Sequence, residues 1–245
     1  INSMAGQIDE LVNRVYKSQV SQKEAELNAL QAQINPHFLF NTLETLRMMA
    51  EVRDERQLSD ALTALGSIMR YNIAGGKQSA TLATEIEHIQ DYVQIQNLLH
   101  NNRIEFRSAI LEPLLACRIP NLLLQPLVEN CIVHGMKNHN GSLNIVIEVE
   151  ETDTSFGRAL RCSVKDDGSG IAPARLEHIV KRLSLDPEQR MPAPSERNAP
   201  RSGGVGLTNV HDRILFAYGQ TDAMRIESEP GRGTVVTITL PAQTT

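Results

Sequence analysis

The chain has 245 residues, of which 41% are hydrophobic and 22% charged, and 24 Lys and Arg against 29 Asp and Glu leave a formal net charge of −5. This composition is typical of a soluble globular protein with one large or two small domains. The negative charge and an aromatic content of 4% argue against a nucleic-acid binder that neutralises phosphates or stacks bases. The longest uncharged apolar run, residues 119–128, is too short to cross a bilayer, so we expect no membrane span in this sequence.

The three cysteines, Cys117, Cys131 and Cys162, show neither a CxxC spacing nor an even count. We therefore expect buried, reduced thiols in a cytosolic protein rather than a metal site or a nucleophile. The sequence shows no signal peptide and begins at Ile1, from which we expect that an upstream portion precedes it.

Apolar residues recur at spacings of three and four over residues 16–34, which predicts a long helix with a heptad seam that Lys23 interrupts. Residues 8–15 are helix-spaced in a different phase, as expected where one helical module passes into another. A single amphipathic helix of this length cannot bury its apolar stripe alone. A parallel homodimer is the simplest way to cover it, and a bundle within one chain is the alternative.

The next segment, residues 33–43, is Gln-Ile-Asn-Pro-His-Phe-Leu-Phe-Asn-Thr-Leu. Pro36 lacks an N–H and disfavours helical geometry at Asn35, so we expect a kink or a new first helical turn here. Beyond Pro36 one helix stripe is apolar, and a second, largely polar stripe carries His37, Asn41, Glu44 and Met48. This pattern predicts a polar surface close to a potential hinge.

The remaining pattern predicts a helical region followed by an α/β region. Helices are expected over residues 58–69, ended by Gly75 and Gly76, and over residues 82–93, opened by Thr84 and Glu87 in capping-box spacing. Strands are expected over residues 103–108, 142–151, 159–166, 223–229 and 234–240, with helices over 122–134, 173–185 and 207–218. We therefore expect a helical hairpin with its connector up to residue 100 and an α/β layer from residue 101. Residues 186–203, rich in proline and without periodicity, predict a long mobile loop.

Three glycine-bearing turns lie in the α/β region, at residues 166–170, 203–207 and 231–234. Glycine permits a close backbone approach to a ligand, and the second turn opens a helix whose free N–H groups can receive phosphate oxygens. Each turn alone is weak evidence, since a glycine pair before a helix is more often an ordinary turn. Asn130 and Glu129 stand in an otherwise apolar helix, where burying a polar group without a partner costs about 1–3 kcal/mol. The alternative is that Asn130 faces solvent.

This region resembles the ATP-binding domain shared by histidine kinases, type II topoisomerases, Hsp90 chaperones and MutL proteins. The resemblance lies in four motifs in this order: the helix with Asn130, Asp-x-Gly-x-Gly, Gly-x-Gly-Leu and Gly-x-Gly-Thr. The resemblance implies the Bergerat-type α/β sandwich with ATP and Mg²⁺ as ligands. It further implies that Asn130 holds Mg²⁺ against the phosphates and that Asp166 accepts a hydrogen bond from the adenine amino group. Gly168 and Gly170 would leave room for the base.

The same resemblance assigns roles to the later turns. Gly204 and Gly206, followed by Leu207, match the glycines at the end of a lid over the triphosphate, and Thr234 matches a residue that supports the adenine site. Glu129 would act as a base or order a water on Mg²⁺. Related proteins often carry a Lys three residues after the Asn, where this chain has Val133. His134 or Lys137 would then supply the missing positive charge.

Residues 33–43, preceded by the heptad helix, closely resemble the phosphoacceptor segment of LytS/YesM-type sensor histidine kinases. The resemblance covers nearly the whole chain and implies that His37 of a homodimer takes the γ-phosphoryl group of ATP and passes it to an aspartate of a response regulator. A neutral imidazole is a competent nucleophile at cellular pH. Asn41 would orient water for dephosphorylating the regulator. Phe38 stands where many related kinases have an acidic base, and Glu44 is the candidate substitute.

Residues 2–11 look like the end of a HAMP linker, which implies that the chain is the cytoplasmic half of a bacterial plasma-membrane receptor. We therefore divide it into a signalling helix (residues 1–33), a dimerisation and phosphoacceptor region (34–100) and a catalytic ATP-binding domain (101–245). Two alternatives stay open. One is an ATPase of the same superfamily without a phosphohistidine, and the other is a non-catalytic dimeric scaffold with a degenerate ATP site.

Overall fold

The computed structural model describes residues 35–73, 79–136, 141–154, 157–185, 205–219 and 223–242. The chain divides into two compact units, Ile1–Leu62 and Thr63–Thr245. The predicted heptad helix, the HAMP-like segment, the glycines at 75 and 76 and the loop over 186–203 lie outside the described residues. Among the helices that are described, none has both the length and the apolar character that crossing a membrane requires.

Helix α2 (Pro36–Val52) is the main described element of the first unit. Its N-cap is Asn35, whose side-chain oxygen accepts a hydrogen bond from the Phe38 N–H at 3.2 Å. Pro36 takes the first helical position, where its missing N–H removes no helical hydrogen bond. The expected new first turn at Pro36 is therefore confirmed. His37 and Asn41 are exposed on the surface of this helix, as predicted.

A tight turn joins α2 to helix α3 (Arg56–Ile73). Asp54 adopts a left-handed conformation with φ of 57°, and the Glu55 N–H donates to the Ala50 carbonyl at 2.9 Å. Ala50 and Ser59 are buried around this turn, at relative exposures of 3% and 7%. Helix α3 begins in the first unit and ends in the second.

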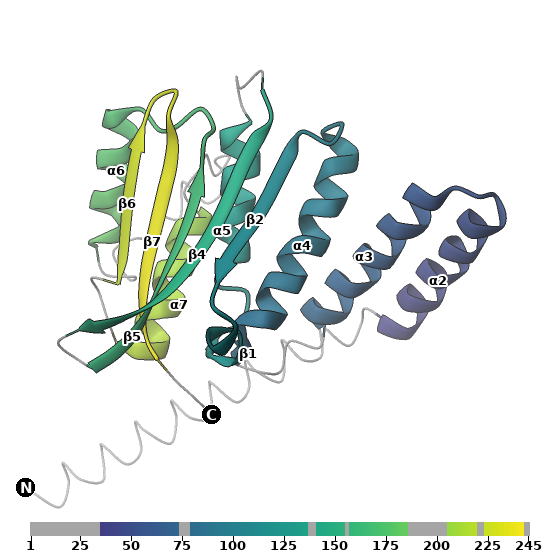
Figure 1. Ribbon diagram of the computed structural model, residues 1–245, viewed down its shortest axis with the longest axis horizontal. Coiled ribbons are helices and arrows are strands. Elements are labelled where there is room, and N and C mark those ends of the chain that lie inside the picture. Colours follow the sequence, from purple (N-terminus) through teal and green to yellow (C-terminus); the bar gives the residue numbers. More distant parts are fainter. Residues whose placement is uncertain are drawn as a thin grey trace, which may run out of the picture. The chain divides into compact units, whose positions relative to one another are not determined.

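The second unit is built on a five-stranded sheet in the order β2-β4-β5-β7-β6 (Figure 1). Its strands are β2 (Ile104–Ile110), β4 (Leu143–Thr154), β5 (Gly157–Asp166), β6 (Met224–Glu229) and β7 (Gly233–Pro241). Strands β2 and β4 pair in parallel, and the other neighbours pair antiparallel. A separate two-stranded sheet joins β1 (Ser79–Thr81) to β3 (Arg118–Pro120).

Helices cover one face of the five-stranded sheet, as Figure 1 shows for α5 and α7. The helical elements of this unit are α4 (Leu82–Leu99), η1 (Glu112–Ala116), α5 (Gln125–Asn130), η2 (Cys131–Gly135), α6 (Pro173–Leu183) and α7 (Val205–Tyr218). The strand register places Cys162 between Val149 and Ile238, and all three side chains are buried in the core. On strand β4, buried and less buried residues alternate over Leu143 to Val149, as expected for a sheet with one covered face.

The five predicted strands and the helices of the α/β region are confirmed, with the strand ends correct to within three residues. The predicted opening of the third helix at Thr84 is wrong. Helix α4 begins at Leu82, and its N-cap is Thr81, whose side chain accepts a hydrogen bond from the Thr84 N–H at 3.2 Å. The short strand β1 holds Thr81 in an extended conformation, and three residues of strand give no recognisable alternation in the sequence.

Helix α4 belongs to the core of the second unit. Its apolar residues Leu82, Ile86 and Ile89 are buried in the same cluster as the sheet. The division of the chain into compact units after Leu62 accordingly places α4 with the sheet. The three cysteines are free and buried, as expected.

The turn between β6 and β7 allows a direct test of backbone packing. Gly231 and Gly233 both have positive φ, at 77° and 97°, but a Cβ on Gly233 would lie 1.9 Å from the Asp166 carbonyl oxygen whereas one on Gly231 would meet nothing. We expect Gly231→Ala to lower the free energy of unfolding by about 1 kcal/mol, the usual penalty of a left-handed Ala. Gly233→Ala should cost roughly 3 kcal/mol or more, because the strand pair must move apart. Chemical denaturation of both variants checks this, and equal losses would contradict it.

Candidate functional site

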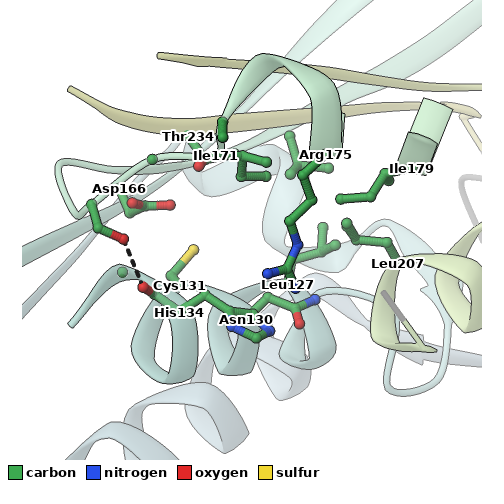
Figure 2. A pocket seen from close by; sticks show the side chains of 15 residues that line it. Leu127, Asn130, Cys131, His134, Asp166, Ile171, Arg175, Ile179, Leu207 and Thr234 are labelled. Carbon is green, nitrogen blue, oxygen red and sulfur yellow. Dashed lines mark hydrogen bonds between the residues drawn. The ribbon is translucent and has the colours of Figure 1, made fainter. Parts of the chain in front are cut away.

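A cavity of about 220 Å³ opens in the second unit between α5, the β5–α6 connection, the start of α7 and β7 (Figure 2). Its wall combines apolar side chains with a few polar ones. The lining residues are Leu127, Asn130, Cys131, His134, Gly135, Asp166, Ser169, Gly170, Ile171, Ala172, Arg175, Ile179, Leu207, Thr234 and Val236. Among the predicted site residues, the cavity thus brings together Asn130, His134, Asp166, Gly170, Leu207 and Thr234.

The helix that carries Asn130 changes its winding inside the site. Helix α5 continues directly into η2, a π-helical turn that contains Cys131, His134 and Gly135. Such turns are rare and occur frequently at functional sites, because they redirect side chains relative to a regular α-helix. Here Asn130, Cys131 and His134 all line the cavity.

Asp166 ends strand β5 and lies opposite Thr234 in the register with β7. One of its carboxylate oxygens accepts the Gly168 N–H at 2.9 Å. Burial raises the pKa of Asp166, and this hydrogen bond acts in the opposite direction. Its neighbour Asp167 is directed elsewhere, since its carboxylate accepts the backbone N–H and the side-chain amide of Asn144 at 2.8 and 2.6 Å. Only Asp166 of the two lines the cavity.

The glycines after Asp166 bring two backbone segments into contact. A Cβ on Gly168 would lie 2.4 Å from the Cα of Gly135, and one on Gly170 would lie 2.0 Å from the Glu229 carbonyl oxygen. The Ser169 N–H donates to the Gly135 carbonyl at 3.0 Å, and the Ser169 hydroxyl donates to the His134 carbonyl at 2.9 Å. Gly168 and Gly170 thus make room for the neighbouring backbone, and Gly168 itself does not line the cavity.

Asn130 carries a buried amide atom, Nδ2, that has no hydrogen-bond partner among the described residues. A Cβ on Gly206 would lie only 2.8 Å from this atom, so the glycine allows α7 to begin directly against the Asn130 amide. Leaving a buried amide unpaired costs about 1–3 kcal/mol. A polar ligand in the cavity would remove this cost, and amide orientation is interchangeable, so either atom can face such a ligand.

The other predicted site residues fall into three groups. Glu129 is not part of the cavity wall, and its carboxylate accepts the Gln125 side-chain amide at 2.8 Å. Lys137 and Gly204 lie outside the described residues. His37 and Asn41 belong to the first unit, where the Asn41 amide nitrogen lies 3.2 Å from Nδ1 and 3.4 Å from Nε2 of the His37 ring.

Arg175 is a site residue that the sequence analysis missed. In Figure 2 its side chain extends from α6 across the cavity toward Asn130. A sequence signal existed, because Arg175 is a cation four residues before Ile179, the buried residue on the same stripe of α6. The cavity therefore has a carboxylate, Asp166, contributed by β5 and a cation contributed by α6.

Comparison with known proteins identifies the class of protein to which the cavity belongs. A family model described as "Histidine kinase-, DNA gyrase B-, and HSP90-like ATPase" matches residues 119–244, which contain the whole cavity wall, and a model described as "Histidine kinase" matches residues 25–104. Residues 119–244 of the second unit therefore form an ATP-binding domain of this class.

The relatives define the family more closely. The chain is 32% identical to sensor histidine kinase YesM of Bacillus subtilis, over 98% of this chain and 37% of that protein. It is 33% identical to sensor histidine kinase YpdA of Escherichia coli, over 96% of this chain and 37% of YpdA. It is 30% identical to sensor protein LytS of Bacillus anthracis, over 89% of this chain and 34% of LytS. The chain belongs to the LytS/YesM family of two-component sensor histidine kinases. It spans about a third of the length of these relatives.

The position of Arg175 predicts a contribution to nucleotide affinity. We expect Arg175→Ala to weaken ATP binding by about three- to tenfold, as for one partly exposed charge-assisted hydrogen bond, and to leave adenosine binding unchanged. Lys181→Ala is the matched control, because it removes a cation from the same helix outside the cavity wall. Titration calorimetry with both ligands measures the difference. An equal loss of ATP and adenosine affinity would show that Arg175 does not act on the phosphates.

Proposed function

We propose that this chain phosphorylates itself on His37 with ATP and passes the phosphoryl group to an aspartate of a response regulator. The observation that carries the proposal is the exposed His37 in the first turn of α2, beside Asn41, in a chain whose other unit is an ATP-binding domain. The "Histidine kinase" model covers this residue, and the relatives named above are sensor kinases.

The proposed chemistry is two phosphoryl transfers. A ring nitrogen of His37 attacks the γ-phosphorus of ATP, the bond from this phosphorus to the β,γ-bridging oxygen breaks, and ADP leaves while the ring gives up its N–H proton to solvent. A carboxylate oxygen of the regulator then attacks the same phosphorus and the N–P bond breaks. Both steps depend mainly on positioning and on neutralising phosphate charge, so the protein needs few reacting groups of its own.

The nucleotide roles follow from the cavity. Asp166 would accept the adenine amino group at one end, with Thr234 beside it. Asn130, His134 and Arg175 would receive the phosphates at the other end, Lys137 would add positive charge there, and Gly204 and Gly206 would lie at the end of the lid. The unpaired Asn130 amide fits an oxygen ligand for Mg²⁺, which would neutralise phosphate charge when bound. Among the described residues there is no cluster of three His, Cys, Asp or Glu side chains, so Asn130 would hold Mg²⁺ together with phosphate oxygens and water.

The neighbours of His37 limit the choice of a general base. Phe38 is 65% exposed and has no proton-accepting group. Glu44 is hydrogen-bonded to Arg47 at 3.0 and 2.5 Å, which lowers the pKa of this carboxyl. A carboxylate so stabilised is a weaker base, so the geometry argues against Glu44 as the substitute. The Asn41 amide, when its oxygen faces the ring, can accept a hydrogen bond from the Nδ1–H and so leave the Nε2 lone pair free to attack.

The assembly and the cellular setting are part of the same proposal. Helix α2 exposes Phe38, Met48, Met49 and Val52, the last at 88%, an apolar surface that a second copy of the chain would cover. Together with the heptad pattern upstream, this supports a homodimer. The HAMP-like residues 2–11 and the greater length of the relatives support a place on the cytoplasmic side of a membrane receptor.

Phosphorylation of His37 is tested by incubating the chain with γ-labelled ATP and Mg²⁺. We expect acid-labile, base-stable label on the wild-type protein and none on His37→Gln, because glutamine has no nucleophilic ring nitrogen. His178→Gln, which replaces an exposed histidine of α6, should label like wild type. ATP binding without any label would favour the non-catalytic scaffold. Steady phosphate release that His37→Gln does not change would favour an ATPase without a phosphohistidine.

Asn41 predicts a separate effect on the phosphorylated regulator. We expect Asn41→Ala to slow dephosphorylation of the regulator about tenfold or more, since it removes the group that positions water. Thr42→Ala is the matched control, because the Thr42 hydroxyl bonds only the Phe38 carbonyl within the helix. The rate is followed as loss of label from the purified phosphorylated regulator. Full phosphatase activity in Asn41→Ala would rule out this role.

A further inference from the structure

The helix that carries Asn130 does not cap its own N-terminus. The N-cap position of α5 is Leu124, whose side chain makes no capping hydrogen bond. The free N–H groups at this end are instead received by Glu85 of α4, which lies far away in the sequence. One Glu85 oxygen accepts the N–H of Leu124 at 3.0 Å and of Gln125 at 3.3 Å. The other accepts the N–H of Leu122 at 3.0 Å.

Glu85 is fully buried, at 0% exposure, in a cluster that is otherwise mainly apolar. Burial raises the pKa of this carboxyl, and hydrogen bonds from Tyr71 and from the three N–H groups act in the opposite direction. All four partners are donors, and both carboxylate oxygens accept, so the arrangement suits the ionised form. A carboxylate at a helix N-terminus also faces the positive end of the helix dipole.

Tyr71 brings the last turn of α3 into this arrangement. Its hydroxyl donates to Glu85 at 3.0 Å, and its ring lies 4.2 Å from the His88 ring, measured between centroids. Tyr71 thus gives α3 a direct polar contact with the Glu85 carboxylate. Helix α3 follows the phosphoacceptor helix α2 in the chain. Its last turn therefore contacts Glu85, the side chain that caps the start of α5.

The start of α5 and Asn130 are only five residues apart, about 7.5 Å along a helix axis. The Gln125 side chain spans part of this length, because its amide donates to Glu129, the residue before Asn130, at 2.8 Å. A shift of the α5 N-terminus therefore moves Asn130, whose amide is already confined by Gly206 on the other side.

We propose that Glu85 and Tyr71 are positioning residues of the ATP site, which set the placement of Asn130 by capping α5 from α4 and α3. Because Tyr71 of the last turn of α3 is hydrogen-bonded to Glu85, a displacement of that turn alters the cap and therefore how the phosphates are held. This inference rests on the proposed function for the role of Asn130 at the phosphates. It adds two residues, neither in the cavity wall, to the groups on which that role depends.

The test compares Tyr71→Phe, which keeps the ring and removes only the hydroxyl, with Glu85→Gln, which keeps the shape and replaces one acceptor by a donor. Mg²⁺-ATP and adenosine binding are measured by calorimetry on the whole chain, beside thermal unfolding. We expect Tyr71→Phe to weaken ATP about threefold and Glu85→Gln about tenfold or more, with adenosine affinity unchanged, because Asp166 is not held by this cap. Tyr218→Phe, a half-buried tyrosine at the end of α7, should leave both affinities unchanged.

The outcomes separate this inference from the proposed function. If Tyr71→Phe lowers the unfolding temperature but binds ATP like wild type, the cap is merely structural and the inference is overturned; this result remains available if Glu85→Gln does not fold. Equal losses for ATP and adenosine would also overturn it. If wild-type protein binds ATP and both variants behave as expected while His37 never becomes labelled, the positioning role stands and the kinase proposal fails.

Discussion

The ATP site depends on one close backbone contact, between the end of η2 and the β5–α6 connection. Gly168 lies so close to the Gly135 backbone that a Cβ on Gly168 would not fit, and Ser169 ties the contact with two hydrogen bonds to η2 carbonyls. This contact brings the helix bearing Asn130 against the strand end bearing Asp166, although the two residues come from different layers of the fold. Because the backbones are in direct contact, the separation of the two segments at this point is set by the main chain rather than by side-chain packing.

Helix α4 is the second element on which the site depends, because it is tied at both ends to the layers beside it. Near its start, Glu85 holds the α5 N-terminus. Near its end, the Asn97 side chain exchanges two hydrogen bonds of 2.9 Å with the backbone of Ile104, the first residue of β2. Its apolar face is buried between these anchors. The helix thus connects the parallel sheet edge to the nucleotide helix as one rigid part.

Secondary-structure elements that follow a repeating sequence pattern were predicted well. Features that depend on a single tertiary contact were predicted poorly. β-branched alternation located all five strands, and Pro36 located the start of α2. Thr84 was misassigned because the cap at Thr81 depends on pairing with β3, which lies far along the chain. Arg175 and Glu85 were missed because the apolar residues of a helix stripe dominate its pattern, and a single charged residue among them attracts little weight. Their roles arise from what the fold places opposite them, and the four-residue spacing of Arg175 and Ile179 shows only that these two residues share a stripe of α6.

The two outer strands of the five-stranded sheet share a further property. On β2 the Arg107 guanidinium pairs with Glu105 at 3.3 Å, and on β6 Arg225 pairs with Glu227 at 2.6 Å. An incoming strand would have to strip water from these charges before it could add to the sheet, and charged outer strands are a common protection against such pairing. Each outer strand therefore resists edge-to-edge pairing with the sheet of another molecule, so any self-association of this unit would have to use surfaces other than the sheet edges.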